Sequence, residues 1–200
     1  MPKDIIINAW REVFVSLILG KKVLKKLKLE ELGRASLEEY RQMNKVPVCV
    51  MLDNIRSMHN VGSAFRTADA FCIDKMFLTG ITGKPPHREI HKTALGATES
   101  VEWEYHENAV ELAKKLKAEG HLIIAIEQAE GSIPIDRFDL RNDQKYILVF
   151  GNEVFGVSDE IMELCDACLE IPQHGTKHSL NVAVSVGIAL WEISRGYTKQ

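Results

Sequence analysis

The sequence predicts an α/β domain built on a mainly parallel sheet. Apolar runs of strand length alternate with amphipathic stretches of helix length, which is typical of a parallel sheet with helices on both faces. The first such run, residues 46–54, is apolar at nearly every position, as expected for a strand buried on both sides. With 200 residues and 46% apolar side chains, the chain is long and apolar enough for one domain with a full core.

Six strands and several helices follow from this alternation. The expected strands are residues 46–54, 75–80, 100–106, 121–128, 145–151 and 167–172. The expected helices begin at Ser57, span residues 88–95, 108–119 and 158–164, and close the chain after residue 180. Residues 5–43 are also expected to be helical, with a capping-box spacing at Ser36 and Glu39 that starts a helix over 37–43. We therefore divide the chain into a helical N-terminal extension, residues 1–45, and an α/β domain, residues 46–200.

The N-terminal extension concentrates positive charge. Residues 1–47 carry ten Lys and Arg against six Asp and Glu, so the remaining residues hold a net charge of −7 in a chain of net charge −3. Five lysines lie within eight positions: Lys21, Lys22, Lys25, Lys26 and Lys28. Such a cluster is either a solvated helix face or a surface for the phosphates of RNA.

Several other features limit the kinds of site and location that we expect for this protein. The four cysteines form no disulfide framework, and Cys165 and Cys168 have metal-like spacing without a second ligand pair, so we expect no metal site. His87 and His91 also lack a third ligand, which leaves RNA contact or plain surface. No signal peptide or membrane span is apparent, and we expect a cytoplasmic protein without membrane contact.

Three strand-end loops carry the candidate chemistry. The first opens a helix after strand 46–54 and contains Asn60 and Arg66 in "NVGSAFRTADAF". The second, "GNEVFGVS", holds Glu153 in a glycine-bracketed turn, and the third is "IPQHGTKHSLNVAVSVGI", with Ser179 and Asn181 before an apolar helix. Each loop has a structural explanation of its own. Arg66 could be a salt-bridge partner, Glu153 could bind loop amides, and Ser179 or Thr176 could cap the helix. Strand ends in parallel sheets are nevertheless where ligands bind.

Together, in this order and spacing, the three loops closely resemble the motifs of the SpoU family of RNA ribose 2'-O-methyltransferases, within the SPOUT superfamily of α/β-knot enzymes. The resemblance covers roughly residues 46–195. Ala183 departs from it, because the family often has Ser there, and we interpret this position as one of packing. The resemblance implies a deep C-terminal trefoil knot, an exception to the general absence of knots. It also implies homodimerisation through the knot region.

The resemblance further implies S-adenosylmethionine as cofactor and RNA, either tRNA or rRNA, as substrate. By motif match, the cofactor contacts are Ile126, Glu127, Gly151, Ile171 and Leu180, and the catalytic group is Arg66, Asn60, Glu153, Ser179 and Asn181. Arg66 is also expected to bind RNA. Because a guanidinium group is a poor general base, we expect Arg66 to stabilise the developing alkoxide and a neighbouring phosphate.

Two other functions compete with this interpretation. A non-catalytic RNA-binding module would keep the fold without turnover, although the presence of all five catalytic positions argues against it. A small-molecule enzyme using another nucleotide ranks last, because the sequence has no G-x-G-x-x-G or Walker pattern. The short basic extension, and the lack of a large N-terminal RNA-binding domain in this chain, favour tRNA over rRNA.

Overall fold

The computed structural model describes residues 25–197, and the chain divides into two compact units between Ser36 and Leu37. This division precedes the predicted boundary between residues 45 and 46. The second unit therefore includes α2 (Leu37–Gln42), which confirms the short helix predicted there.

The described part of the first unit, residues 25–36, is less helical than predicted. Residues 25–28 have no regular structure, η1 (Leu29–Leu32) is a single 3-10 turn, and residues 33–36 are again irregular. The helix predicted through residues 25–36 is therefore wrong. Two features explain the difference. Gly33 takes a left-handed conformation with φ 56°, which ends η1. Lys25 and Lys28 are three residues apart, so their like charges would repel each other on one side of a helix. The part of that prediction before residue 25, with Lys21 and Lys22, lies outside the described residues.

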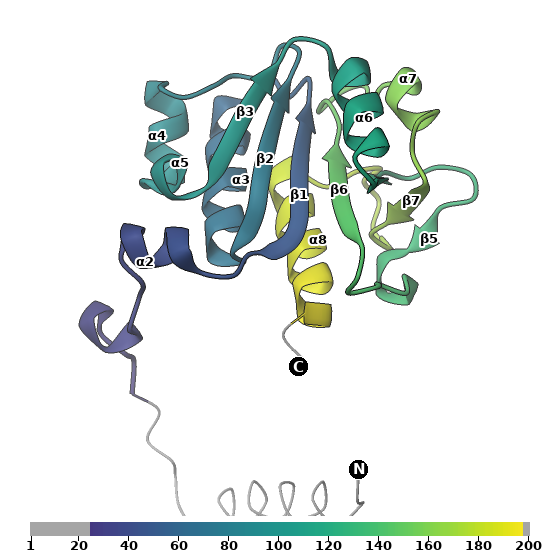
Figure 1. Ribbon diagram of the computed structural model, residues 1–200. Coiled ribbons are helices and arrows are strands. Elements are labelled where there is room, and N and C mark those ends of the chain that lie inside the picture. The colour runs from purple at the N-terminus through teal and green to yellow at the C-terminus, as the bar shows by residue number, and fades with distance from the viewer. Residues whose placement is uncertain (1–24, 198–200) are drawn as a thin grey trace, which may run out of the picture. The chain divides into compact units, whose positions relative to one another are not determined.

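A seven-stranded, fully parallel sheet forms the centre of the second unit (Figure 1). Its spatial order is β3-β2-β1-β6-β4-β7-β5. The strands are β1 (Val46–Asp53), β2 (Ile73–Thr79), β3 (Glu102–His106), β4 (His121–Ile126), β5 (Ile133–Pro134), β6 (Lys145–Phe150) and β7 (Ala167–Glu170). The prediction of six strands misses β5, which is only two residues long and pairs with β7 at the sheet edge. So short a segment has no period-two pattern to detect.

Helices cover both faces of the sheet (Figure 1). The helices are α3 (Met58–Ala70), α4 (Arg88–Ala94), α5 (Ala97–Ser100), α6 (Ala109–Ala118), α7 (Asp159–Met162) and α8 (Val182–Tyr197), and η2 (Ile135–Arg137) is a 3-10 turn. On one face, α3 and α8 pack against alternate strand residues such as Val50 and Leu148. On the other, α6 and α7 pack against Met51 and Ile147. This alternation confirms that the central strands are buried on both sides.

The strand register brings the three motif loops to one edge. Leu52 of β1 pairs with Phe150 of β6, and Ile126 of β4 pairs with Leu169 of β7. The loops that follow β1, β4, β6 and β7 therefore emerge side by side at the carboxyl end of the sheet, where parallel α/β sheets bind ligands. Within residues 25–197, no helix is long and apolar enough to span a bilayer.

Candidate active site

A pocket of about 680 Å³ opens at this carboxyl edge, between the ends of β4, β6 and β7. Its volume lies in the range of sites for small molecules and cofactors. Five lining residues are those predicted for cofactor contact: Ile126, Glu127, Gly151, Ile171 and Leu180. Three lining residues belong to the predicted catalytic group: Glu153, Ser179 and Asn181. The structure thus brings residues from three separate strand ends to one cavity.

Asn60, Glu153 and Asn181 form one hydrogen-bonded network at the edge of this pocket. The Asn60 side-chain amide donates to Glu153 Oε1 at 2.9 Å, and the Asn181 amide donates to Asn60 Oδ1 at 3.1 Å. The three residues come from α3, from the turn after β6 and from the segment before α8. A single line of bonds therefore joins all three motifs.

Glu153 anchors the start of α3 as well. Its carboxylate accepts the backbone N–H groups of Arg56 at 2.9 Å and Ser57 at 3.0 Å, which confirms the amide-binding role considered from the sequence. Burial raises the pKa of Glu153, but the bonds from Arg56, Asn60 and Ser57 outweigh burial and hold that pKa below its ordinary value. The group is therefore an ionised acceptor at neutral pH, suited to positioning rather than to proton donation.

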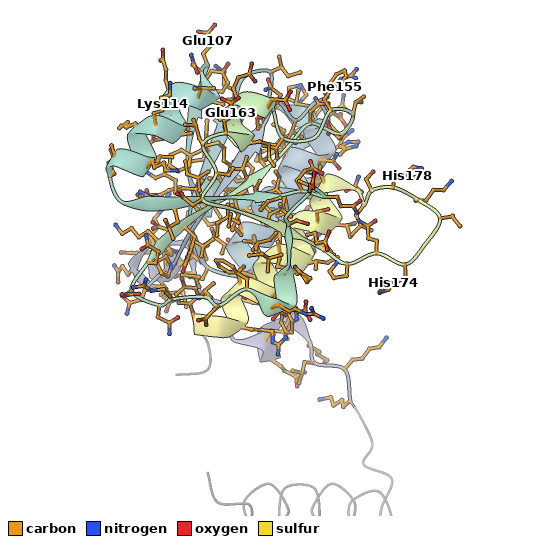
Figure 2. The ribbon with its side chains drawn as sticks, turned by 90° about the vertical axis from the view of Figure 1, so that its right-hand side faces the viewer. Glu107, Lys114, Phe155, Glu163, His174 and His178 are labelled. Carbon is orange, nitrogen blue, oxygen red and sulfur yellow. The ribbon has the colours of Figure 1, made fainter. Side chains whose placement is uncertain are left out.

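Asn181 also begins α8. Its Oδ1 accepts the N–H of Ala183 at 2.9 Å, as an N-cap side chain does. Neither Ser179 nor Thr176 makes a hydrogen bond with the described residues, so the alternative that one of them caps the helix is wrong. Both lie on the exposed loop after β7, which Figure 2 shows projecting from the sheet with His174 and His178. Ser179 and His178 line the pocket.

Arg66 lies two turns along α3, exposed and outside the pocket lining. Within residues 25–197 it makes no hydrogen bond or ion pair. Its helical position places it on the side of α3 that carries His59 and Ser63, whereas Asn60 faces Asn181. The guanidinium group is therefore available to a ligand that approaches over α3.

Two glycines allow the pocket wall to close tightly. A Cβ added at Gly151 would lie 2.0 Å from the backbone of Gly156, and one at Gly156 would lie 2.3 Å from Glu127 Oε2. Gly156 also has φ 72°, a conformation that favours glycine. Any side chain at either position would displace the turn that presents Glu153.

Two residues of this region were not predicted from the sequence. Asn152 donates to the carbonyl of Asn54 at 2.7 Å and accepts the N–H groups of Val154 and Phe155, so it shapes the Glu153 turn. Asp53, almost fully buried, accepts from Ser158 Oγ at 2.9 Å and ties β1 to the start of α7. A carboxylate that ends an apolar strand, as Asp53 does, was the available signal.

The remaining predicted residues lie elsewhere. Lys25, Lys26 and Lys28 are exposed in the first unit, where Lys25 pairs with Glu31 at 3.1 Å. His87 caps α4 by accepting the N–H of Glu89 at 3.2 Å, and His91 is exposed on the same helix. Burial raises the pKa of Cys165 to about 11 and also raises that of Cys168. No group of metal-binding side chains is found among residues 25–197.

Comparison with known proteins gives a consistent family. The model of the SpoU rRNA Methylase family matches residues 47–191. A tRNA (guanosine(18)-2'-O)-methyltransferase from Aquifex aeolicus is 32% identical over 163 residues, which cover 80% of this chain and 74% of that enzyme. A 23S rRNA (guanosine-2'-O-)-methyltransferase RlmB from Neisseria meningitidis is 31% identical, covering 76% of this chain and 60% of that enzyme.

Solved structures agree with these sequences. The A. aeolicus TrmH/SpoU tRNA modifying enzyme superposes with a TM-score of 0.73 at 30% identity, covering 82% of this chain and 83% of that one. The AdoMet-bound rRNA methyltransferase from Sinorhizobium meliloti superposes with a TM-score of 0.71 at 29% identity, covering 78% and 60%. The motif network, the pocket and the family match over residues 47–191 lead to one conclusion: the chain belongs to the SpoU methylase family.

Proposed function

We propose that this chain is an S-adenosylmethionine-dependent methyltransferase that modifies a ribose 2'-hydroxyl of RNA. The observation that carries the proposal is the network of Asn60, Glu153 and Asn181 at the edge of the 680 Å³ pocket. The similarity to enzymes named as tRNA and 23S rRNA 2'-O-methyltransferases supports it.

The pocket suits the cofactor in size and chemistry. Ile126, Ile171 and Leu180 offer apolar surface for an adenine ring, and the close-packed backbone at Gly151 offers peptide groups for polar contacts. The nearby carboxylate of Glu127 accepts the N–H of Val157 at 3.2 Å, which fixes it in the wall. When bound, S-adenosylmethionine supplies a methyl group already activated by its sulfonium charge.

The protein's task is then to position the ribose and to stabilise charge. Arg66 is a permanent cation, so it stabilises the developing alkoxide and the neighbouring phosphate, and that phosphate takes the hydroxyl proton. The hydrogen bonds among Asn60, Glu153 and Asn181 hold the three motif loops in fixed positions relative to one another. Ser179 orients the ribose from the pocket wall. Positioning of this kind accounts for a large share of the barrier reduction in transfer reactions.

The proposal extends to the assembly and the chain path. A second copy of this chain covers the exposed apolar side of α8, where Val184 is 49%, Ile188 36% and Trp191 58% exposed. These residues recur at helical spacing and form one stripe, which favours an interface. We also assign a trefoil knot to the segment after β6, on the family resemblance and on the position of the loop after β7 beside the pocket. A second protomer over α8 would bring its groups close to the loops that carry the site.

For the substrate we favour tRNA, because the basic N-terminal extension is short. The other candidate is rRNA, because relatives that act on tRNA and on rRNA match over similar lengths. Lys21, Lys22, Lys25, Lys26 and Lys28 are assigned to RNA phosphates. Such RNA is met in the cytoplasm, which also agrees with four cysteines that form no disulfide.

The test is transfer of labelled methyl groups to RNA, followed by nuclease digestion of the product. The proposal expects label in a 2'-O-methylated nucleoside, which resists alkaline cleavage of the adjacent phosphodiester. Cofactor binding without label in any RNA would instead support a non-catalytic RNA-binding module. Label in a base rather than a ribose would overturn the assigned reaction.

A further inference from the structure

The surface formed by α3, α4 and the loops that lead into them is positively charged in an otherwise acidic part of the chain. Residues 54–70 and 80–98 contain five Lys and Arg and two carboxylates, Glu89 and Asp69, whereas residues 48–200 carry a net charge of −7. Asp69 lies in the last turn of α3, where it accepts a hydrogen bond from Ser100 Oγ. We define the α3–α4 basic face by six exposed residues: Arg56, His59, Lys84, Arg88, His91 and Lys92.

The two helices pack closely enough for their charges to form one surface. A Cβ added at Gly62 of α3 would lie 2.3 Å from the carbonyl oxygen of Ile90 and 2.1 Å from Thr93 Oγ1 of α4, so only glycine allows this approach. Thr93 Oγ1 then donates to the carbonyl of His59 at 3.1 Å, which fixes the register of the two helices.

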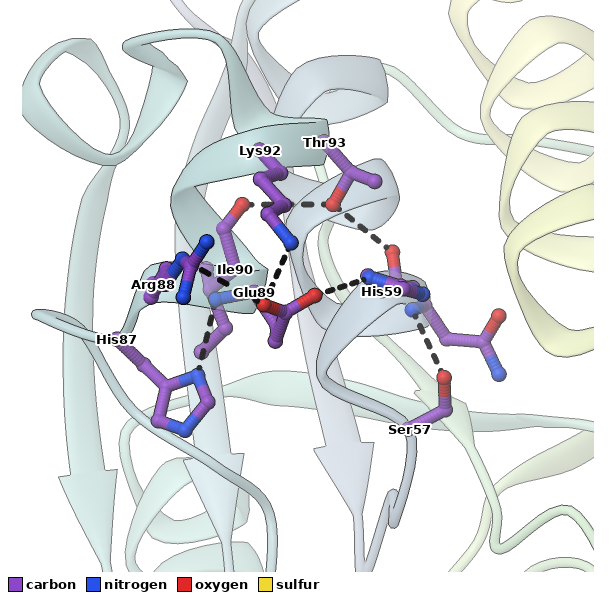
Figure 3. A network of polar contacts seen from close by, with 9 residues as sticks. Ser57, His59, His87, Arg88, Glu89, Ile90, Lys92 and Thr93 are labelled. Atoms are coloured by element: carbon purple, nitrogen blue, oxygen red, sulfur yellow. Dashed lines mark hydrogen bonds and ion pairs between the residues drawn. The ribbon is translucent and has the colours of Figure 1, made fainter.

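Glu89 lies among these basic side chains and contacts three of them (Figure 3). Its carboxylate contacts His59 Nε2 at 2.8 Å, Lys92 Nζ at 2.7 Å and Arg88 Nε at 4.0 Å. Hydrogen bonds from Lys92 and His59 lower the pKa of Glu89, so its charge is retained at neutral pH. One carboxylate cannot neutralise the whole face, and the Arg88 side chain remains 85% exposed.

The face is continuous with the proposed catalytic residues. His59 and Arg66 are seven residues apart on α3, so they lie on the same side of that helix. At the other end, the Arg56 backbone N–H donates to Glu153. An RNA strand that passes over Arg66 would therefore continue directly over the Lys and Arg side chains of α4.

We propose that the α3–α4 basic face binds the phosphodiester backbone of the RNA next to the methylated nucleotide. This inference rests on the proposed function and adds a second contact surface, separate from the lysines of the N-terminal extension. Cations spaced along two adjoining helices suit a polyanion with regularly repeated phosphates. An acidic protein partner is the alternative that the experiment below excludes or supports.

The experiment compares two double variants in the full-length protein. The α4 variant, Arg88→Gln/Lys92→Gln, removes two charges from the face. The α6 variant, Lys114→Gln/Lys115→Gln, removes two charges from α6, on the opposite side of the sheet, where Glu107 and Glu163 also lie (Figure 2). RNA affinity is measured from 50 to about 300 mM salt on whichever unmodified RNA, tRNA or rRNA, the wild type methylates. Cofactor affinity and melting temperature are measured for both variants.

The α4 variant is expected to flatten the slope of log affinity against log salt by about 1.4 to 1.8 units, because each lost phosphate contact removes about 0.7 to 0.9. The α6 variant keeps the wild-type slope, and both keep the wild-type cofactor affinity. Glu89→Gln removes the carboxylate that contacts His59, Arg88 and Lys92. This variant is expected to bind RNA about two- to five-fold tighter, because it loses one exposed charge of the same sign as the phosphates. A merely structural role for Glu89 gives no such gain.

The inference is overturned if the α4 and α6 variants have the same salt slope while the wild type methylates RNA normally. Wild-type protein that binds cofactor but methylates no RNA contradicts the proposed function instead. RNA binding unchanged in the α4 variant, together with salt-sensitive capture of an acidic protein by the wild type alone, would assign the face to a protein partner and not to RNA.

Discussion

The side-chain amide of Asn181 donates to Oδ1 of Asn60 at 3.1 Å, across 121 residues of sequence. Asn181 uses its own Oδ1 to cap α8, and Asn60 uses its amide to bind Glu153. Asn181 thus begins α8 and also aligns the segment that contains Asn60 with the start of that helix. The two roles can be separated by substitution because they use different atoms of the same side chain.

Asn181→Asp keeps the capping oxygen and loses the donor to Asn60, whereas Asn181→Ala loses both. We expect Asn181→Asp to lower methyl transfer at least ten-fold, since a carboxylate would face the Asn60 oxygen and Glu153. Asn181→Ala is expected to lose activity and about 1 kcal/mol of stability as well. Thermal unfolding and methyl-transfer rates measured on the same preparations distinguish the two, and full activity in Asn181→Asp would refute the alignment role.

Glu153 makes stability depend on pH in the acidic range. Its pKa in the folded chain lies below the ordinary value of 4.5, so its stabilising contribution is complete above about pH 4.5 and is lost as the pH falls through the folded-state pKa. Glu153→Gln lacks this titration. We expect the melting temperature of the wild type to exceed that of the variant at pH 7, and this difference to narrow as the pH falls below about 4.5. Parallel curves would show that the hydrogen bonds to Arg56, Ser57 and Asn60 do not favour the ionised form.

The apolar side of α8 provides a test of the assembly. Val184→Glu places a charge in the exposed stripe with Ile188 and Trp191 and is expected to dissociate the proposed homodimer to the 22.6 kDa chain. Ile81→Glu, at a side chain 63% exposed in the loop after β2, is the matched control and keeps the dimer. Sedimentation velocity measures both. A wild type that sediments as a monomer at micromolar concentration would remove the basis for this interface.

The N-terminal lysines are expected to contribute to RNA binding independently of the α3–α4 basic face. Replacing Lys21, Lys22, Lys25, Lys26 and Lys28 by Gln should weaken RNA binding and flatten its salt dependence. Lys25 already pairs with Glu31, so it is expected to contribute less than Lys26. The individual variants Lys25→Gln and Lys26→Gln test that order. An unchanged salt slope in the fivefold variant would assign the cluster to a solvated surface.

Most of the α/β unit could be predicted because its signals are local. The apolar run that forms β1 and the capping residue Asn108 of α6 each specify structure within a few positions. The extension between residues 25 and 36 was predicted wrongly as helix. Its periodic Leu and Lys residues resemble a helix face, but Gly33 and the clustered like charges decide the local conformation.

The site could be predicted only in part. The three motifs indicated which residues gather, and the pocket lining agrees for Ile126, Gly151 and Leu180. The partners inside the site could not be predicted. Asn181 pairs with Asn60, and Ser158 with Asp53, through tertiary contacts more than 100 residues apart, which depend on strand order rather than on local sequence. The capping of α8 by Asn181 rather than by Ser179 depends in the same way on the loop conformation.

The most direct measurement is methyl transfer from labelled S-adenosylmethionine to separate pools of unmodified tRNA and rRNA, by the wild type, Arg66→Lys and Arg66→Ala. The account predicts label in one pool for the wild type, a reduced rate for Arg66→Lys, and none for Arg66→Ala, with cofactor affinity within about two-fold in all three. Wild-type activity retained by Arg66→Ala would contradict the assigned chemistry at its central residue.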